Sequence, residues 1–399
     1  MPSHANVTMR LAPPSVTMNH SSRRTIRVMH LVGKLGTGGM ENGVINICHN
    51  LPQSRFQSSI CTFESGGAME ERIDKQVVDV FHVAKRVGND PILPIRLARL
   101  LKRQRIDILH SHNWGTLIEG VVAAKLCGTA VVVHGEHGMI YDQPRQVWAQ
   151  KLAWRRVDQV LAVSDALASR MFETIGYPKE RIQVIPNGVD SDFFSPSHHS
   201  KEDARRQLGL PVDGVMVGMV ARFVPFKNHL GAIRSLAIAT ESGAPFHLAL
   251  AGGGQLAGEL RQLVDDLNLN SKVHFLGELE RVRPFLHALD VFLSNSTHRE
   301  GMSNAVLEAM ACRLPVVATR VAASPELLDS GSSGILIQPG NDQALADAVM
   351  KLSKDQHLRS RLSEKARERA VQVYGFSKMI QNYTDLYQAL WATKQLERQ

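Results

Sequence analysis

The 399-residue sequence contains few cysteines, few aromatic residues and no long apolar run. Its four cysteines are far apart and form no C-x-x-C pair, which excludes a disulfide scaffold and a zinc ribbon and favours a reducing cytoplasm. The most apolar stretch, 117–133, is interrupted by Glu119 and Lys125, so we expect no membrane-spanning helix. Aromatic residues make up only 6% of the chain and do not alternate with basic ones. A nucleic-acid partner is therefore not expected.

Two common nucleotide-binding signatures are also missing. Neither G-x-G-x-x-G nor G-x-x-x-x-G-K-[ST] occurs, which argues against a dinucleotide oxidoreductase and a P-loop NTPase. The formal net charge of +8 at pH 7 is compatible with phosphorylated ligands or an anionic membrane face. Residues 1–24 have no apolar core typical of a secretory signal, and we expect them to form a disordered leader.

Beyond this leader, short apolar runs alternate with longer amphipathic stretches, which is typical of βαβ units and parallel sheets. The pattern occurs twice and predicts an α/β fold of two Rossmann-like, doubly wound domains, 25–194 and 211–374, joined by a linker at 195–210 rich in turn formers. The expected strands are 26–32, 59–63, 79–83, 106–110, 130–134, 159–163 and 183–186, then 215–220, 247–251, 272–276, 291–294, 316–319 and 335–338. Ligands of such domains bind at the carboxyl ends of strands, here in the cleft between the two domains.

Two loops have the composition of an anion site. After the first strand, Gly36, Gly38 and Gly39 would let backbone N–H groups approach a ligand at a helix N-terminus. After the first strand of the second series, Arg222 and Lys227 lead into a helix and suit a diphosphate. A plain glycine turn and solvated surface charges are the respective alternatives.

The segment 300–311 contains Glu300 and Glu308, with a helix expected to begin near Ser303. If both glutamates were on one helix, their carboxylates would lie about 12 Å apart along the helix axis. This exceeds the ~5–9.5 Å of glycoside hydrolases and disfavours a hydrolytic pair. An extended ligand could meet both glutamates, whereas the simpler alternative makes Glu308 a solvent-facing helix residue.

These motifs together resemble the retaining nucleotide-sugar glycosyltransferases of the GT-B fold, specifically glycosyltransferase family 4. The pairing of G-G-M-E-N-G with G-E-H-G at 135–138 resembles further a subgroup of sugar transferases linked to bacterial exopolysaccharide. The resemblance rests on G-T-G-G-M-E at 36–41, P-N-G-V-D at 186–190, A-R-F with Lys227, A-G-G-G at 251–254, H-F-L-G at 274–277, E-G-M-S-N-A-V-L-E-A-M-A at 300–311 and L-P-V-V-A-T at 314–319.

The resemblance implies that the C-terminal domain holds most of the sugar donor. It also implies that the last helix, within 375–399, crosses back onto the N-terminal domain. The implied donor contacts are Leu276 and Gly277 near the nucleobase, Glu308 on the ribose, Arg222 and Lys227 on the diphosphate, Glu300 with Gly301, Met302, Ser303 and Asn304 around the sugar, and Gly38 and Gly39 closing over the diphosphate.

In the implied mechanism the acceptor hydroxyl attacks on the leaving-group face, the departing phosphate oxygen takes its proton, and the anomeric configuration is retained. Cations and helix dipoles can neutralise the leaving diphosphate, so neither a cofactor nor a metal is expected. The competing metal hypothesis uses the D-x-D at Asp190 and Asp192, or His110 with His112.

The family places a histidine near the donor sugar, and His134 and His137 compete for that role. We favour His137, which is flanked by glycines, with Glu136 nearby to fix its tautomer or its charge. His112, Asn113 and His134 are expected on the acceptor side. The residues assigned catalytic roles are His137, Glu300, Arg222 and Lys227.

Three residues depart from the family pattern: Arg313, Ala322 and Ala323 stand where glycines are common. If those positions need positive φ, the substitutions cost energy or reshape the pocket. A catalytically silent nucleotide-sugar-binding protein is therefore one alternative function. Another GT-B reaction, such as sugar-nucleotide epimerisation, is the second.

The basic stretch 96–105 lies on an expected amphipathic helix. It is either a solvated helix face or a docking surface for an anionic membrane leaflet. The expected partners are thus a nucleotide sugar, UDP- or GDP-linked, a glycan or lipid-linked acceptor, and a membrane surface. The expected location is cytoplasmic, peripheral on the inner face of the membrane.

Overall fold

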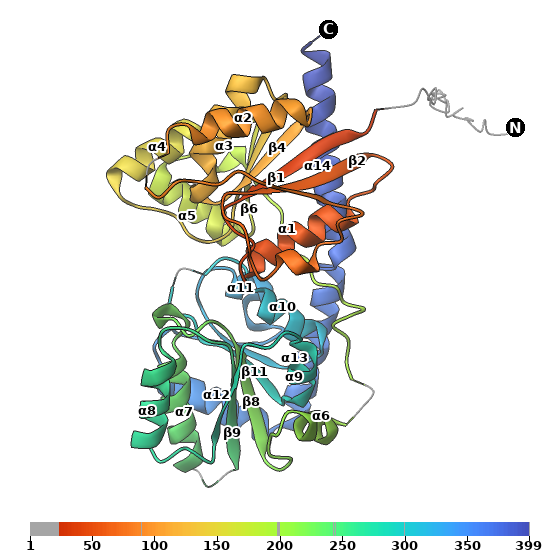
Figure 1. The fold of residues 1–399 in the computed structure, drawn as a ribbon. Helices are drawn as coiled ribbons and strands as arrows, with labels where there is room; N and C mark the ends of the chain where they lie inside the picture. The colour runs from red at the N-terminus through yellow and green to blue at the C-terminus, as the bar shows by residue number, and fades with distance from the viewer. Residues whose placement is uncertain are drawn as a thin grey trace, which may run out of the picture.

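The computed structural model describes residues 24–398 apart from 89, 198, 199, 242, 244 and 299. All but the last residue of the expected leader lies outside these described residues. The chain forms two parallel α/β domains stacked end to end, with helices on both faces of each sheet (Figure 1). This is the two-domain Rossmann-like architecture that the alternating sequence pattern predicts.

The N-terminal domain contains a seven-stranded sheet of order β3-β2-β1-β4-β5-β6-β7, in which all neighbouring strands are parallel. Its strands are β1 (Ile26–Val32), β2 (Phe56–Thr62), β3 (Asp79–His82), β4 (Ile108–His112), β5 (Val131–Glu136), β6 (Gln159–Ala162) and β7 (Ile182–Val184). Its helices are α1 (Gly39–Asn50), η1 (Glu70–Arg72), α2 (Leu93–Arg103), α3 (Trp114–Cys127), α4 (Pro144–Trp154), α5 (Asp165–Ile175) and η2 (Lys179–Arg181).

The C-terminal domain contains a six-stranded parallel sheet of order β10-β9-β8-β11-β12-β13. Its strands are β8 (Val215–Val220), β9 (Phe246–Ala251), β10 (Val273–Gly277), β11 (Val291–Ser294), β12 (Val316–Thr319) and β13 (Ile335–Ile337). The remaining helices are α6 (Lys201–Gln207), η3 (Pro225–Lys227), α7 (His229–Glu241), α8 (Ala257–Asp266), α9 (Arg283–Ala288), α10 (Asn304–Ala311), α11 (Ser324–Leu327), η4 (Asp329–Gly331), α12 (Asp342–Lys354), α13 (Gln356–Gln372) and α14 (Phe376–Leu396).

The stretch 195–210 includes an ordered element. Helix α6 is capped by the Ser200 hydroxyl, which accepts from Asp203 N. The buried Arg205 side chain forms an ion pair with Asp290 at 2.5 Å and donates to Ala288 O. Half of the expected linker is therefore packed onto the C-terminal domain.

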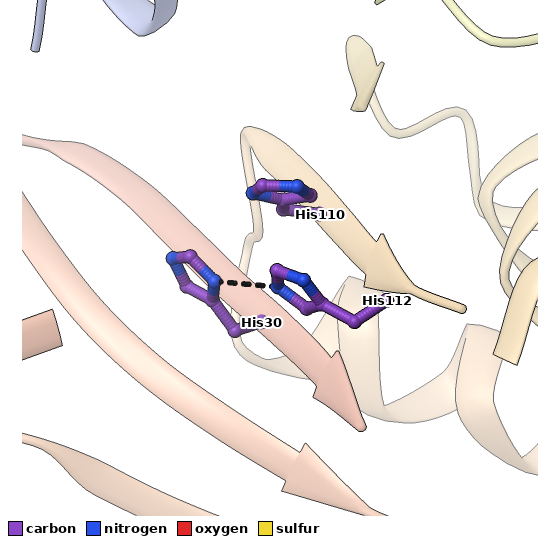
Figure 2. Close-up of side chains that lie close together, drawn as sticks. All are labelled: His30, His110 and His112. Atoms are coloured by element: carbon purple, nitrogen blue, oxygen red, sulfur yellow. Dashed lines mark hydrogen bonds between the residues drawn. The ribbon is translucent and has the colours of Figure 1, made fainter. Parts of the chain in front are cut away.

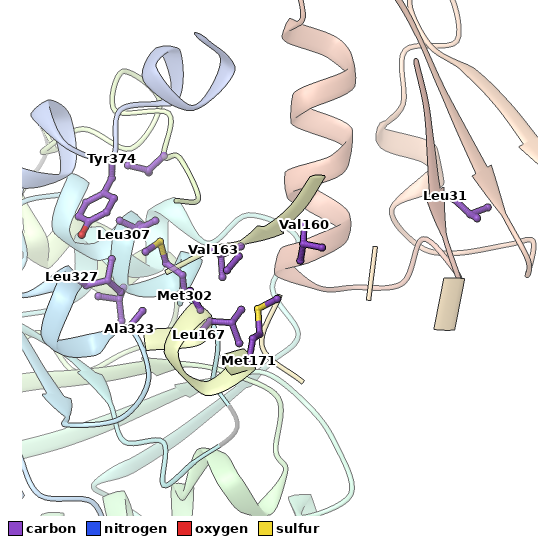
Figure 3. Close-up of a cluster of buried hydrophobic side chains, with 14 of the residues drawn as sticks. Leu31, Val160, Val163, Leu167, Met171, Met302, Leu307, Ala323, Leu327 and Tyr374 are labelled. Atoms are coloured by element: carbon purple, nitrogen blue, oxygen red, sulfur yellow. The ribbon is translucent and has the colours of Figure 1, made fainter. Parts of the chain in front are cut away.

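The last helix, α14, starts near the junction of the domains and runs along the N-terminal domain (Figure 1). Its apolar side chains Met379, Tyr383 and Tyr387 belong to the buried cluster that covers one face of the N-terminal sheet. A second cluster contains Val163 and Leu167 of the N-terminal domain together with Met302 and Ala323 of the C-terminal domain (Figure 3). The two domains are thus joined by shared apolar packing as well as by covalent connections. No helix in the described part of the chain is long and apolar enough to cross a membrane.

Candidate active site

The carboxyl ends of the two sheets meet where the loop after β5 touches the loop before α10. A Cβ built on Gly138 would lie 2.8 Å from Gly301 N, and one built on Gly301 would overlap His137 O. Side chains could not be added here without separating the loops. This contact places His137 of one domain beside Glu300 of the other, which brings together two residues assigned catalytic roles.

Four further hydrogen bonds join the domains around this point. Asn187 Nδ2 donates to Asn304 Oδ1 at 2.8 Å, and Asn304 Nδ2 donates to Gly39 O at 3.1 Å. Glu326 accepts from Asp165 N at 3.0 Å and from Ala166 N at 2.6 Å, which caps α5 from across the cleft. The glycine loop at 36–39 therefore closes directly over the start of α10.

The expected diphosphate cation Lys227 lies at the end of η3 and is paired with Glu300. Its Nζ lies 2.7 Å from Oε1 and 2.6 Å from Oε2 of that glutamate, and Ser296 Oγ donates to Oε2 at 2.7 Å. Both side chains of the ion pair are largely buried, with 16% and 13% exposed. Lys227 and Glu300 thus form one polar unit on the C-terminal side of the cleft.

Arg222 is exposed and makes no side-chain hydrogen bond or ion pair within the described residues. It lies across from Glu41 in the first turn of α1, where burial raises the pKa of the Glu41 carboxyl and Arg222 opposes that rise. The unpaired Arg222 cation of the C-terminal domain is therefore near enough to the half-buried Glu41 carboxyl of the N-terminal domain to act on its pKa.

Helix α10 begins as the sequence predicts. Ser303 is its N-cap, and its hydroxyl accepts from Val306 N at 3.4 Å. The side chain of Glu308, one turn into the helix, makes no hydrogen bond or ion pair with the described residues. Burial raises the pKa of its carboxyl to about 7, while Arg72 opposes the rise. Glu300 precedes the helix, so the two glutamates do not share one helix axis.

The expected nucleobase site adjoins the A-G-G-G turn. Gly252 N donates to Gly277 O at 2.7 Å, and Phe223 N donates to Gly253 O at 2.7 Å. Leu276 is half-buried, whereas Gly277 is exposed. The backbone turns after β8, β9 and β10 are therefore held against one another near Arg222.

On the N-terminal side, the structure groups His137 with His112 and Asn113. His137 Nε2 lies 2.9 Å from His112 Nδ1, and His137 N donates to Asn113 Oδ1 at 3.1 Å. Burial and, to a smaller extent, the neighbouring His134 lower the pKa of His137 to about 4. His137 is therefore a neutral imidazole at pH 7.

His134 is close enough to affect the pKa of His137, but its hydrogen bonds go to other residues. Successive strand residues point to opposite faces of a sheet, and His134 lies on the other face of β5 from Gly135. His134 is fully buried against Trp154, with Ser111 Oγ 2.9 Å from Nδ1 and Glu136 Oε1 3.0 Å from Nε2. Glu136 hydrogen-bonds His134 and not His137, so the expectation that Glu136 fixes the tautomer of His137 is wrong; the ring that contacts His137 is His112.

Two of the unusual positions do adopt left-handed backbone. Arg313 has φ 60° and Ala322 has φ 46°, whereas Ala323 has φ −78°. The residues that stand in place of the family's glycines therefore have a strained backbone at two of the three positions, 313 and 322. Arg313 also pairs with Glu364 on the surface.

The two candidate metal groups differ in their contacts. Asp190 Oδ1 accepts from Asp192 N at 3.1 Å and from Phe193 N at 2.9 Å, so this carboxylate stabilises a turn. Ring nitrogens of His30, His110 and His112, all buried, lie within 4.8 Å of one another (Figure 2). The sequence alone does not assign His30, Asn187 or Glu326 to the site. Of the three, only Asn187 lies in a recognisable motif, the P-N-G sequence at 186–188.

The two facing Rossmann-like domains with a cleft between them form a fold of the GT-B type. The family model described as Glycosyltransferase Family 4 matches residues 37–193, and that described as Glycosyl transferases group 1 matches residues 200–369. The chain belongs to this family and is a glycosyltransferase.

Individual relatives agree with this assignment. The UDP-Gal:alpha-D-GlcNAc-diphosphoundecaprenol alpha-1,3-galactosyltransferase of Escherichia coli is 25% identical over 382 residues, which cover 92% of this chain and 98% of that protein. The N-acetyl-alpha-D-glucosaminyl L-malate synthase of Bacillus anthracis is 27% identical over 317 residues, covering 78% and 82%. Anabaena HepE in complex with UDP has a TM-score of 0.80 at 24% identity, covering 92% of this chain and all of that one. A Rickettsia africae glycosyltransferase has a TM-score of 0.81 at 20% identity, covering 92% and 98%.

Proposed function

We propose that this glycosyltransferase moves a hexose from a UDP-sugar to a glycan or lipid-linked acceptor with retention of anomeric configuration. The observation that carries the proposal is the convergence of Lys227, unpaired Arg222 and the start of α10 on one side of the cleft, with His137 facing them. A UDP donor is supported by the HepE complexes with UDP and with UDP-glucose, and by the UDP-Gal in the name of the Escherichia coli relative.

Charge neutralisation carries most of the chemistry in this proposal. The leaving diphosphate gains negative charge as the glycosidic bond breaks, and preorganised cations stabilise that charge without rearranging. Arg222 has free donors for phosphate oxygens, and Lys227 is held in place by Glu300 and Ser296. The N–H groups at the start of α10 add positive potential.

The acceptor hydroxyl attacks from the face that the diphosphate leaves, and a phosphate oxygen takes its proton. No protein nucleophile is needed in this sequence of events. His137, neutral at pH 7, offers one ring nitrogen to the sugar, and Glu308 accepts from the ribose hydroxyls. We propose metal-independent transfer with no cofactor, because Arg222, Lys227 and the N–H groups at the start of α10 can offset the charge of the leaving diphosphate.

The acceptor reaches the cleft past the N-terminal domain, whose helix α2 presents a mixed surface. Arg99, Lys102 and Arg103 are exposed, and the apolar Ile95 is 43% exposed beside them. The opposite side of α2 packs on the core through Leu97 and Leu101. We propose that this face docks on an anionic membrane leaflet, on the cytoplasmic side, where lipid-linked acceptors are held.

The direct test is a transfer assay with UDP- and GDP-sugars, chelator and a lipid-linked glycan acceptor. We expect transfer from a UDP-hexose, with the product keeping the anomeric configuration of the donor by proton NMR. Glu308→Ala should abolish transfer, whereas Glu259→Ala, an exposed residue of α8, should leave it unchanged. Wild-type turnover by the Glu308 variant would overturn the assignment.

The same assay separates the alternative functions. A silent binding protein would bind the donor without forming product, and an epimerase would change the sugar without an acceptor. The strained Arg313 and Ala322 are the observations that favour the silent alternative.

A further inference from the structure

A row of buried histidines leads from helix α14 to the candidate active site. His30 comes from β1, and His110 and His112 come from β4, with all three side chains on the same face of the sheet (Figure 2). His137 lies at the outer end of this row. His137 and the His112 ring that contacts it belong to the candidate site described above, whereas His30 and His110 lie deeper and are fully buried.

The row is connected by close nitrogen pairs. His30 Nδ1 lies 3.0 Å from His112 Nε2, and His112 Nδ1 lies 2.9 Å from His137 Nε2. His110 forms a separate branch, because its Nδ1 pairs with the Tyr387 hydroxyl of α14 at 2.7 Å. An unbroken hydrogen-bonded path therefore runs from His30 to His137 through both nitrogens of His112.

Burial keeps these rings neutral. It lowers the pKa of His30 to about 3 and that of His137 to about 4, and it lowers the pKa of His112 well below the ordinary value. A neutral imidazole has one N–H donor and one lone pair. Each close pair must therefore contain one donor and one acceptor, which couples the tautomers of the three rings.

Only two arrangements satisfy both pairs. In the first, His30 and His112 each donate from Nδ1, so His137 accepts at Nε2 and carries its proton on Nδ1. In the second, every proton sits on Nε2, and His137 Nδ1 is a bare acceptor. The environment of His30 distinguishes the two arrangements, because His30 Nε2 is buried without a hydrogen-bond partner among the described residues. The second arrangement leaves an N–H donor there unsatisfied, which is the rarer and costlier condition.

We propose that His30 and His112 are positioning residues that fix His137 as the Nδ1–H tautomer. In this tautomer the Nδ1–H group of His137 donates a hydrogen bond to the bound nucleotide sugar. The inference rests on the proposed function for the ligand that receives this bond. His137 Nδ1 has no hydrogen-bond partner among the described residues and is the nitrogen left for that ligand. An N–H group at His137 Nδ1 can donate to oxygen atoms of the sugar or the diphosphate. An unprotonated Nδ1 would instead place its lone pair against a phosphate oxygen and repel it.

The test reads the tautomers directly. The ligand-free, metal-analysed wild-type protein is labelled with ¹⁵N in its histidine rings, and long-range ¹H–¹⁵N spectra are recorded at pH 7. We expect His137, His112 and His30 to show protonated Nδ1 and unprotonated Nε2. Tautomers of His137 with the proton on Nε2, or a stoichiometric metal bound by His30, His110 and His112, would overturn the proposal.

Two substitutions at His30 separate positioning from packing. His30→Leu removes the first donor, whereas His30→Asn places an amide N–H near the position of Nδ1. In the leucine variant we expect the His137 nitrogen signals to shift toward averaged values and kcat to fall about tenfold, with KM for the donor within about twofold. The asparagine variant should restore both. If the His137 nitrogen signals are unchanged in a folded His30→Leu variant, the proposal that His30 fixes the His137 tautomer is overturned, regardless of the effect on kcat.

The spectra also distinguish this failure from failure of the proposed function. They are recorded without substrate, so they test the tautomers of the three histidines even if the wild-type protein transfers no sugar. Thermal melting of each variant confirms that the native fold is present. If His30→Leu does not fold, the wild-type tautomers still decide the proposal.

Discussion

At the scale of single residues, Glu308 has a carboxyl whose protonation should control donor binding. Burial raises its pKa to about 7, so roughly half of the molecules carry a neutral Glu308 at pH 7. A carboxylate accepts from two ribose hydroxyls, while the protonated form gives up part of this capacity. We expect affinity for a UDP-sugar to increase as pH rises from about 6 to 8.

Calorimetric titration with UDP-glucose checks this prediction, since its diphosphate does not titrate in that range. Glu308→Gln should bind more weakly than wild type and with little dependence on pH. An equally steep pH dependence in the glutamine variant would show that another group is responsible.

Ala322 is the second residue with a local consequence. Its φ of 46° costs an alanine about 1 kcal/mol, while glycine adopts it freely. We expect Ala322→Gly to raise the free energy of unfolding by up to about 1 kcal/mol. Urea denaturation measures the change.

The next residue supplies the matched control. Ala323 is buried with φ −78°, so Ala323→Gly loses packing and gains unfolded-state entropy. It should destabilise the protein by about 1 kcal/mol. Equal destabilisation by both substitutions would contradict the assignment of strain to position 322.

At the scale of elements, apolar runs made most of the fold predictable. Strands 26–32, 215–220, 291–294 and 316–319 have the expected bounds because their residues are nearly all buried and apolar. The strand expected at 106–110 is wrong by two residues and extends to His112. Its end is a polar H-S-H sequence that is nonetheless buried, and no hydrophobic pattern indicates this.

The site was predictable where a motif lies within one loop and its helix. Lys227 leads into a helix and α10 begins after Ser303, as the local sequence predicts. The contacts of Asn187, Glu326 and His30 depend on segments more than 80 residues apart, and local patterns do not encode such packing. The face occupied by His134 follows from strand register, in which a shift of one residue exchanges the two faces.

The exposed face of α2 gives the element-scale prediction. Arg99→Glu with Lys102→Glu should strongly reduce co-sedimentation with anionic vesicles, because each basic side chain near the surface adds ~1 kcal/mol. Added salt should weaken wild-type binding as well. The control is Lys351→Glu with Lys354→Glu, two exposed lysines of α12. Equal losses in both double variants would argue against a docking face on α2.

At the scale of the whole molecule, the buried histidines link stability to pH. The folded-state pKa values of His30 and His137, about 3 and 4, lie below the unfolded value of about 6.5. Between these values the unfolded chain binds more protons, so stability is full above pH 6.5 and falls as pH decreases. Each such histidine contributes up to ~1.4 kcal/mol per pH unit.

Urea melts at pH 7, 6 and 5 measure this dependence. Glu308 acts in the opposite direction because its folded pKa is raised, but four buried histidines outweigh it. His30→Asn should show a shallower decline than wild type. A free energy of unfolding that does not change between pH 7 and 5 would contradict the neutral state of the row.

The two domains hold their parts of the site against each other through Asn187, Glu326 and the shared apolar cluster. The central claim is that the cleft between them binds a nucleotide sugar through Lys227 and Glu308. Calorimetric titration of the purified protein with UDP-sugars, in the presence of chelator, tests it most directly. The account predicts one saturable site, weakened about tenfold or more by Lys227→Ala and by Glu308→Ala. Absence of binding, or wild-type affinity in both variants, would contradict it.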